Sequence, residues 1–88
     1  MDTEYITDLI KDLETADEVV VVFVTKRGDR RIMRCTLNPI NIPVELLGAG
    51  EEKQIDKEFV IGVYDYDNSA WRAFRKDSII CHNVVDWQ

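Results

Sequence analysis

Basic residues gather in two short stretches of this chain, and a tryptophan lies within the second. If residues 70–76 form a strand, Trp71 and Arg75 share one face and Arg72 points to the other. Guanidinium groups can clamp phosphates while an aromatic ring stacks on a base. This pattern therefore predicts a surface for a nucleic acid or a nucleotide. The candidate ligand-binding residues are Arg31, Arg34, Trp71, Arg72 and Arg75.

The same residues have a second, purely structural interpretation. The arginines could form ordinary surface ion pairs with Asp29, Asp65, Asp67 and Asp77, and Trp71 could belong to the core. Exposed ion pairs are common and carry little functional information. Asp65 and Asp67 could also hold a divalent cation, or they could cap a turn through their carboxylates. The sequence leaves these alternatives open.

A second candidate site is the acidic N-terminal segment, because seven of the seventeen acidic residues lie within residues 1–18. Asp8, Asp12 and Glu14 fall on the polar side of an expected helix and could dock on a basic groove of a host protein. An ordinary solvated helix face would have the same composition. A homo-oligomer formed through exposed edge strands is a third alternative.

The remaining reactive residues favour neither an enzyme nor a metal site. Cys81 and His82 are adjacent, so on a strand they point to opposite faces, and no second Cys or His stands at a chelating spacing. Cys35 has no base near it in sequence, and the glycines of residues 48–50 are not followed by the lysine of a phosphate-binding loop. We therefore expect no cofactor, no metal and no catalysis.

Composition limits the size and the location of the protein. With 88 residues, 45% hydrophobic content and a net charge of −6, we expect one acidic globular domain over residues 1–88, a helix in 1–17 and a barrel in 18–88. The longest apolar run, Val19–Val24, is far shorter than the roughly 20 residues of a membrane span. The acidic N-terminus is also unlike a signal peptide. These features predict a cytoplasmic protein with reduced cysteines and no membrane partner.

The hydrophobic pattern predicts the elements that position these candidates. Ile6, Leu9, Ile10 and Leu13 form one apolar helical stripe. Alternation and turn residues predict strands over residues 19–25, 30–37, 58–66, 70–76 and 79–87, with an irregular loop over 38–57 that contains one helical turn at 44–47. This order favours a mainly β fold, a small SH3-like or Sm-like five-stranded antiparallel barrel with an N-terminal amphipathic helix. An open antiparallel sheet with the helix across one face is the alternative.

Two stretches of the chain, residues 33–39 and 70–79, also resemble a known family. They are similar to small, largely phage-encoded proteins grouped as Sm-like SH3 β-barrel relatives of the WYL domain, and the resemblance covers roughly residues 19–80. In the WYL domain the final motif has an Arg, an aromatic residue, an Arg and an Asp before a hydrophobic residue. The matching residues here are Arg72, Phe74, Arg75, Asp77 and Ile79.

This resemblance implies a barrel fold and a binding or regulatory role. WYL domains are regarded as sensors or binders of nucleic-acid or nucleotide ligands that often regulate bacterial defence or transcription. A phage origin would place the protein in the cytoplasm of a bacterial host. The alternative function is an acidic factor that binds and modulates a host protein.

Overall fold

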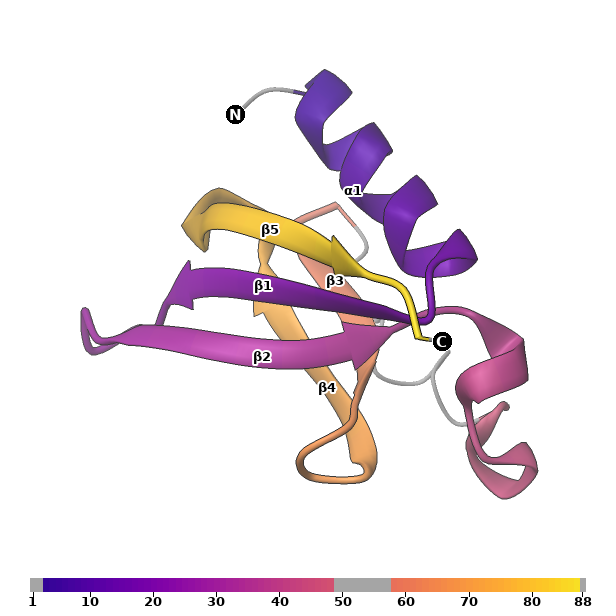
Figure 1. Cartoon of the computed structure of the whole chain (residues 1–88). Helices are drawn as coiled ribbons and strands as arrows, with labels where there is room; N and C mark the ends of the chain where they lie inside the picture. The colour runs from indigo at the N-terminus through magenta and orange to yellow at the C-terminus, as the bar shows by residue number, and fades with distance from the viewer. Residues whose placement is uncertain (1–2, 49–57, 88) are drawn as a thin grey trace.

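One antiparallel sheet and one long helix form the structure of residues 3–48 and 58–87, the residues that the computed structural model describes. The helix and the strands are α1 (Thr3–Thr15), β1 (Glu18–Val24), β2 (Arg30–Thr36), β3 (Val60–Asp65), β4 (Ala70–Arg75) and β5 (Ile79–Val85). The strand order is β4-β3-β2-β1-β5. The sheet curves strongly, so that β3 and β4 cross behind β1 and β2 (Figure 1). The predicted helix and five antiparallel strands are therefore present.

Helix α1 packs through the predicted apolar stripe. Leu9 and Leu13 are fully buried and join Val19 and Val21 of β1 in the core. The helix ends before residue 17, the end of the predicted range 1–17, because the chain leaves helical geometry after Thr15 and enters β1 at Glu18; residues 1–2 lie outside the described residues. No helix within residues 3–48 and 58–87 is long and apolar enough to cross a membrane.

The end of β2 satisfies the last carbonyl groups of α1. The backbone N–H of Leu37 donates to the carbonyl of Leu13 at 2.8 Å. The Thr36 hydroxyl lies 3.4 Å from the carbonyls of both Leu13 and Ala16. The final carbonyls of a helix have no partner within the helix, so these contacts remove a desolvation cost and fix α1 to the sheet.

Strands β1 and β2 form the predicted hairpin around Gly28. Gly28 has a φ of +89°, a conformation that L side chains rarely adopt, and this angle closes the turn. The register pairs Val19 with Cys35 and Phe23 with Arg31. Because side chains alternate along a strand, Arg31 lies on the side of the sheet that also carries Phe23.

The region between β2 and β3 contains two short 3-10 turns, η1 (Pro39–Asn41) and η2 (Val44–Leu46); a third, η3 (Lys76–Ser78), precedes β5. The helical turn predicted at 44–47 corresponds to η2. The indole N–H of Trp71 donates to the carbonyl of Leu46 at 2.6 Å, which attaches η2 to β4. Residues 49–57 of the predicted loop lie outside the described residues.

The sheet is open at one end. Strands β3 and β4 pair over their whole length, from Val60 opposite Arg75 to Asp65 opposite Ala70. In contrast, β2 and β3 pair only at Cys35 with Asp65 and at Thr36 with Tyr64. The first half of β2 therefore separates from β3, and a gap remains between β2 and β4.

Candidate functional site

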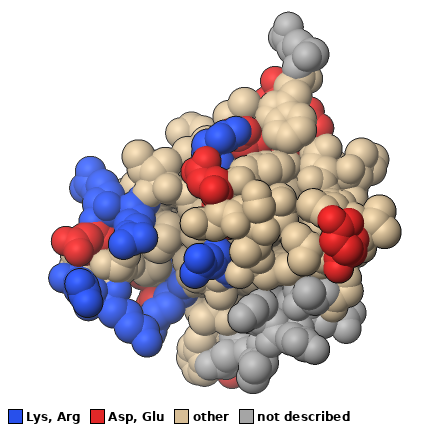
Figure 2. Space-filling model, turned by 90° about the horizontal axis from the view of Figure 1, so that it is seen from below, with Lys and Arg blue, Asp and Glu red and all other residues tan. Residues whose placement is uncertain are grey.

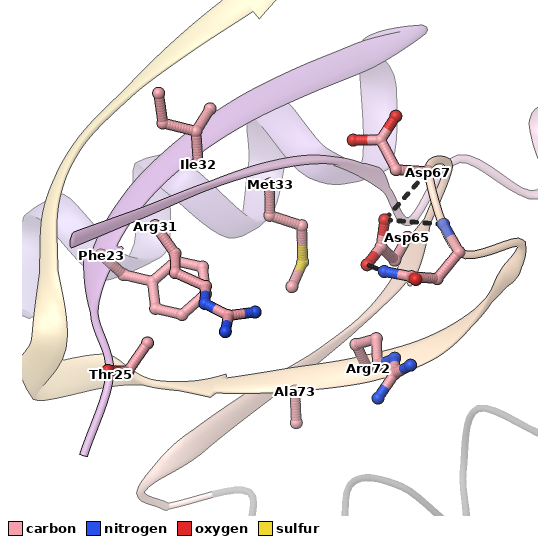
Figure 3. Close-up of a pocket in the computed structure, with 10 residues that line it drawn as sticks. Phe23, Thr25, Arg31, Ile32, Met33, Asp65, Asp67, Arg72 and Ala73 are labelled. Atoms are coloured by element: carbon pink, nitrogen blue, oxygen red, sulfur yellow. Dashed lines mark hydrogen bonds between the residues drawn. The ribbon is translucent and has the colours of Figure 1, made fainter. Parts of the chain in front are cut away.

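A cavity of about 330 Å³ occupies the gap between β2 and β4. Phe23 and Met33 form its apolar floor, and the rings of Phe23 and Phe74 stack at 5.5 Å, so the floor continues into the core. Arg31 of β2 and Arg72 of β4 line the cavity on its two sides (Figure 3). The gap thus brings together two of the five ligand-binding candidates from different strands.

The guanidinium groups of Arg31 and Arg72 form no ion pair with the acidic side chains that the structure describes. Both residues are exposed. Within the described parts of the chain, neither guanidinium takes part in a salt bridge. Two positive charges above an apolar floor can hold an anionic group that carries an apolar or aromatic part.

The two acids that border the cavity are already engaged. Asp65 is only 3% exposed and accepts hydrogen bonds from the backbone N–H of Asp67 at 3.0 Å and the side-chain amide of Asn68 at 2.6 Å (Figure 3). It therefore caps the β3–β4 turn, in agreement with the turn-capping interpretation. Asp67 pairs with Arg34 at 3.2 Å. Neither carboxylate is paired with Arg31 or Arg72.

Arg34 lies on the opposite face of β2 and is held by acidic side chains. Its Nε and Nη2 donate to the two carboxylate oxygens of Glu18, both at 3.0 Å. Glu18 is 6% exposed and also accepts a hydrogen bond from the indole N–H of Trp87 at 3.1 Å. The hydrogen bonds from Arg34 lower the pKa of Glu18, although burial opposes this shift, and Glu18 raises the pKa of Arg34. Arg34 is thus part of a structural ion-pair network.

Trp71 and Arg75 are also engaged with other parts of the protein. Trp71 is partly buried, donates to Leu46 and packs edge-on against Tyr64 with ring centroids 6.4 Å apart. Arg75 is exposed and binds the carboxylate of Asp77 through Nε at 3.1 Å and Nη2 at 2.9 Å. The predicted alternation along β4 is found, but the cavity contains Arg72 without Trp71.

The three candidates on the acidic helix also differ in their exposure and contacts. Asp8 and Glu14 are exposed, whereas the carboxylate Oδ2 of Asp12 lies 3.0 Å from Nε2 of His82 on β5. Nδ1 of His82 lies 2.7 Å from the Tyr5 hydroxyl. His82 therefore links β5 to α1, a role that the sequence analysis missed because its partners are 70 and 77 residues away.

The two cysteines differ sharply in their surroundings. Cys35 is fully buried, and burial raises the pKa of its thiol to about 12, with a smaller contribution from the charge of Asp65. The thiol donates to the carbonyl of Val19 at 3.5 Å. Because the thiolate is the reactive form, Cys35 is a poor nucleophile. Cys81 is exposed.

Comparison with known proteins gives one match. A search of curated proteins and a search of solved structures each found no match. A family model described as WYL_2, Sm-like SH3 beta-barrel fold, matches residues 6–80. This range confirms the resemblance and extends it into α1, which the resemblance had left out. The chain therefore belongs to the WYL_2 family and has its Sm-like SH3 β-barrel fold.

Proposed function

We propose that this protein is a non-catalytic binding module that holds a nucleotide phosphate, free or within a nucleic acid, in the cavity between β2 and β4. The observation that carries the proposal is the pair of guanidinium groups of Arg31 and Arg72, which line one cavity without salt-bridge partners among the described residues. Guanidinium groups form short, charge-assisted hydrogen bonds with phosphate oxygens. Membership of the WYL_2 family supports a small binding or regulatory module.

The dimensions and the floor of the cavity suit a small ligand. Clefts for small molecules typically enclose roughly 300–1,000 Å³, and this cavity of about 330 Å³ is near the lower limit. Met33 and Phe23 offer apolar surface for a sugar or a base, while the arginines hold the phosphate. This division between an apolar floor and a few charged groups is typical of ligand-binding sites.

The net charge of −6 does not oppose this proposal, because the charges are unevenly distributed. Figure 2 shows the Lys and Arg side chains gathered at the end of the molecule where Figure 1 places the β1–β2 turn. A local positive potential can concentrate anions even when the total charge of a protein is negative.

The acidic helix supports the alternative function, docking on a basic protein partner. Its exposed carboxylates include Asp8 and Glu14, but Asp12 is already held by His82. The helix therefore offers a smaller free acidic surface than the sequence predicts. From the resemblance to phage-encoded proteins, we propose that either function operates in the cytoplasm of a bacterial host.

Binding of a fluorescent mononucleotide, followed by anisotropy, tests the proposed function. We expect Arg31→Gln and Arg72→Gln each to weaken binding at least tenfold, because each removes hydrogen bonds to a charged group. Added salt should weaken binding by the wild-type protein. Asp8→Lys with Glu14→Lys should not reduce affinity. Wild-type affinity in the Arg31→Gln/Arg72→Gln double variant, with a native circular dichroism spectrum, would overturn the proposal.

A further inference from the structure

We infer that two copies of this chain form a two-fold dimer, in which their β5 strands pair antiparallel and join the two sheets edge to edge. This interface is separate from the proposed ligand site, because none of the described residues that line the cavity between β2 and β4 belongs to β5. Three features of β5 point to it: an unpaired edge, the absence of charged residues that would block pairing, and the order of the exposed side chains.

Strand β5 is an outer strand of the sheet and, among the described strands, pairs only with β1 (Figure 1). No backbone hydrogen bond from a described residue outside β1 reaches its other edge. The N–H and C=O groups along that edge can therefore pair with a strand from another chain. The pairing with β1 is regular from Cys81 to Val85, since its one register shift lies before Cys81. Most of β5 thus has the geometry that a pairing strand requires.

Strand β5 also lacks the residues that normally prevent such pairing. Native edge strands usually carry a lysine, another charged side chain or a proline. Ile79–Val85 contains no Lys, Arg, Asp, Glu or Pro, whereas β4 at the opposite edge of the sheet presents the exposed Arg72 and Arg75. Pairing of β5 with β4 of the next copy, which would build a ring or a filament, would desolvate these arginines. Pairing of β5 with β5 brings none of these charges together and is therefore favoured.

The side chains of β5 match one self-pairing register. Residues that lie opposite each other across a two-fold axis must point to the same side of the sheet, so the axis passes through a residue. With the axis at His82, Ile80 of each copy lies opposite Val84 of the other. These two side chains are 46% and 45% exposed in the single chain, so the pairing buries apolar surface. An axis at either neighbouring residue would instead place the imidazole opposite Ile80 or Val84.

The ring of His82 is compatible with a place on the axis. Its Nδ1 lies 2.7 Å from the Tyr5 hydroxyl and its Nε2 lies 3.0 Å from Asp12, so α1 of the same chain already satisfies both nitrogens. One strand pair gives an interface near or below the lower end of the roughly 1,200–2,000 Å² that is typical of stable complexes. We therefore expect a weak dimer, with a Kd of about 10–100 µM.

Sedimentation velocity of the full chain tests the dimer. Monomers should predominate at about 2 µM and dimers at about 500 µM, on either side of the expected Kd. Ile80→Lys/Val84→Lys should weaken the dimer at least tenfold, because each introduced lysine lies opposite another. Ile80→Lys/Val84→Glu should restore it, because each lysine then lies opposite a glutamate. Ile40→Lys, at a side chain that is 88% exposed on η1, is the matched control and should change nothing.

A thiol at position 83 tests the register independently. With the axis at His82, Asn83→Cys places the introduced thiol opposite Cys81 of the second copy. Directly opposite residues have Cα atoms roughly 4.5–5.5 Å apart, within the range of a disulfide. Oxidation with diamide should therefore convert Asn83→Cys into covalent dimers on a non-reducing gel. Wild type and Asn83→Cys/Cys81→Ser should remain monomeric on this gel, since Cys35 is fully buried.

Each other outcome overturns a stated part of the inference. A monomer at about 500 µM, or a dimer that persists in Ile80→Lys/Val84→Lys with a native circular dichroism spectrum, would exclude the β5 interface. Oligomers larger than a dimer would exclude the two-fold arrangement. Failure of Ile80→Lys/Val84→Glu to restore the dimer would exclude the register. Covalent dimers of wild type would move the axis to Cys81, and those of Asn83→Cys/Cys81→Ser would move it to Asn83.

Discussion

Arg31 and Arg34 lie three residues apart on β2 but have opposite surroundings. Arg34 is held by Glu18 and Asp67, whereas Arg31 lines an open cavity and has no salt bridge among the described residues. Alternation turns the two side chains to opposite faces of the strand. The comparison suggests a criterion for the candidates: Arg31, which forms no salt bridge with a described residue, can bind a ligand without first breaking one, whereas Arg34 cannot.

The same contrast separates the two ends of β2. At the closed end, β2 pairs with β3 and satisfies the carbonyl groups of α1. At the open end, β2 leaves β3 and borders the cavity. We therefore expect substitutions at the closed end to lower stability and substitutions at the open end to lower binding.

The largest expected effect on stability is at the closed end of the core. Leu13→Ala should lower the free energy of unfolding by about 3–5 kcal/mol, because Leu13 is fully buried and its removal leaves a cavity. Met33→Ala, at a partly buried residue of the cavity floor, should cost less than half as much. Urea denaturation followed by circular dichroism measures both values. Equal losses would contradict the division into two ends.

The second effect concerns the acid that holds Arg34. Glu18→Gln should lower the free energy of unfolding by about 1.5–3 kcal/mol, because it removes charge-assisted hydrogen bonds from a buried carboxylate. Arg31→Gln should change the free energy of unfolding by no more than about 0.5 kcal/mol, as substitutions of other exposed residues do. The same urea experiment applies. A large destabilisation by Arg31→Gln would show that Arg31 is structural.

The stabilisation by Glu18 should depend on pH. The pKa of Glu18 is lower in the folded protein than its ordinary value of 4.5, because Arg34 donates to its carboxylate. This contribution is therefore fully present above the unfolded pKa and is lost as the pH falls through the folded pKa. The stability difference between wild type and Glu18→Gln should stay constant from pH 7 to about 5 and shrink below pH 4.5. A constant difference down to pH 3 would refute the assigned role.

The fold was predictable because its signals are local. The stripe that contains Leu9 and Leu13 and the alternation along β4 come from neighbouring residues, so the structure confirms them. The predicted element bounds differ from the observed ones mainly at their ends, where fraying and turns compete with regular geometry.

The site was only partly predictable because it depends on contacts between distant segments. Arg31 and Arg72 were both candidates, but their meeting in one cavity follows from the separation of β2 from β3. The bond from Trp71 to the carbonyl of Leu46 and the bond from His82 to Asp12 likewise depend on how the elements pack. Residue type alone cannot show which candidate is already engaged.

The smallest predicted effect tests whether an ion pair stabilises the fold when its acidic partner is exposed. Asp77 binds Arg75 with geometry similar to that of the Glu18–Arg34 pair, but both side chains are more than half exposed, at 56% and 54%. Exposed ion pairs contribute little, because water solvates the separated charges. Asp77→Asn should therefore lower the free energy of unfolding by about 0.5 kcal/mol or less in urea denaturation. A loss of stability as large as that of Glu18→Gln would show that burial of the acid does not set the strength of these ion pairs. Arg75 would then stabilise the fold as Arg34 does.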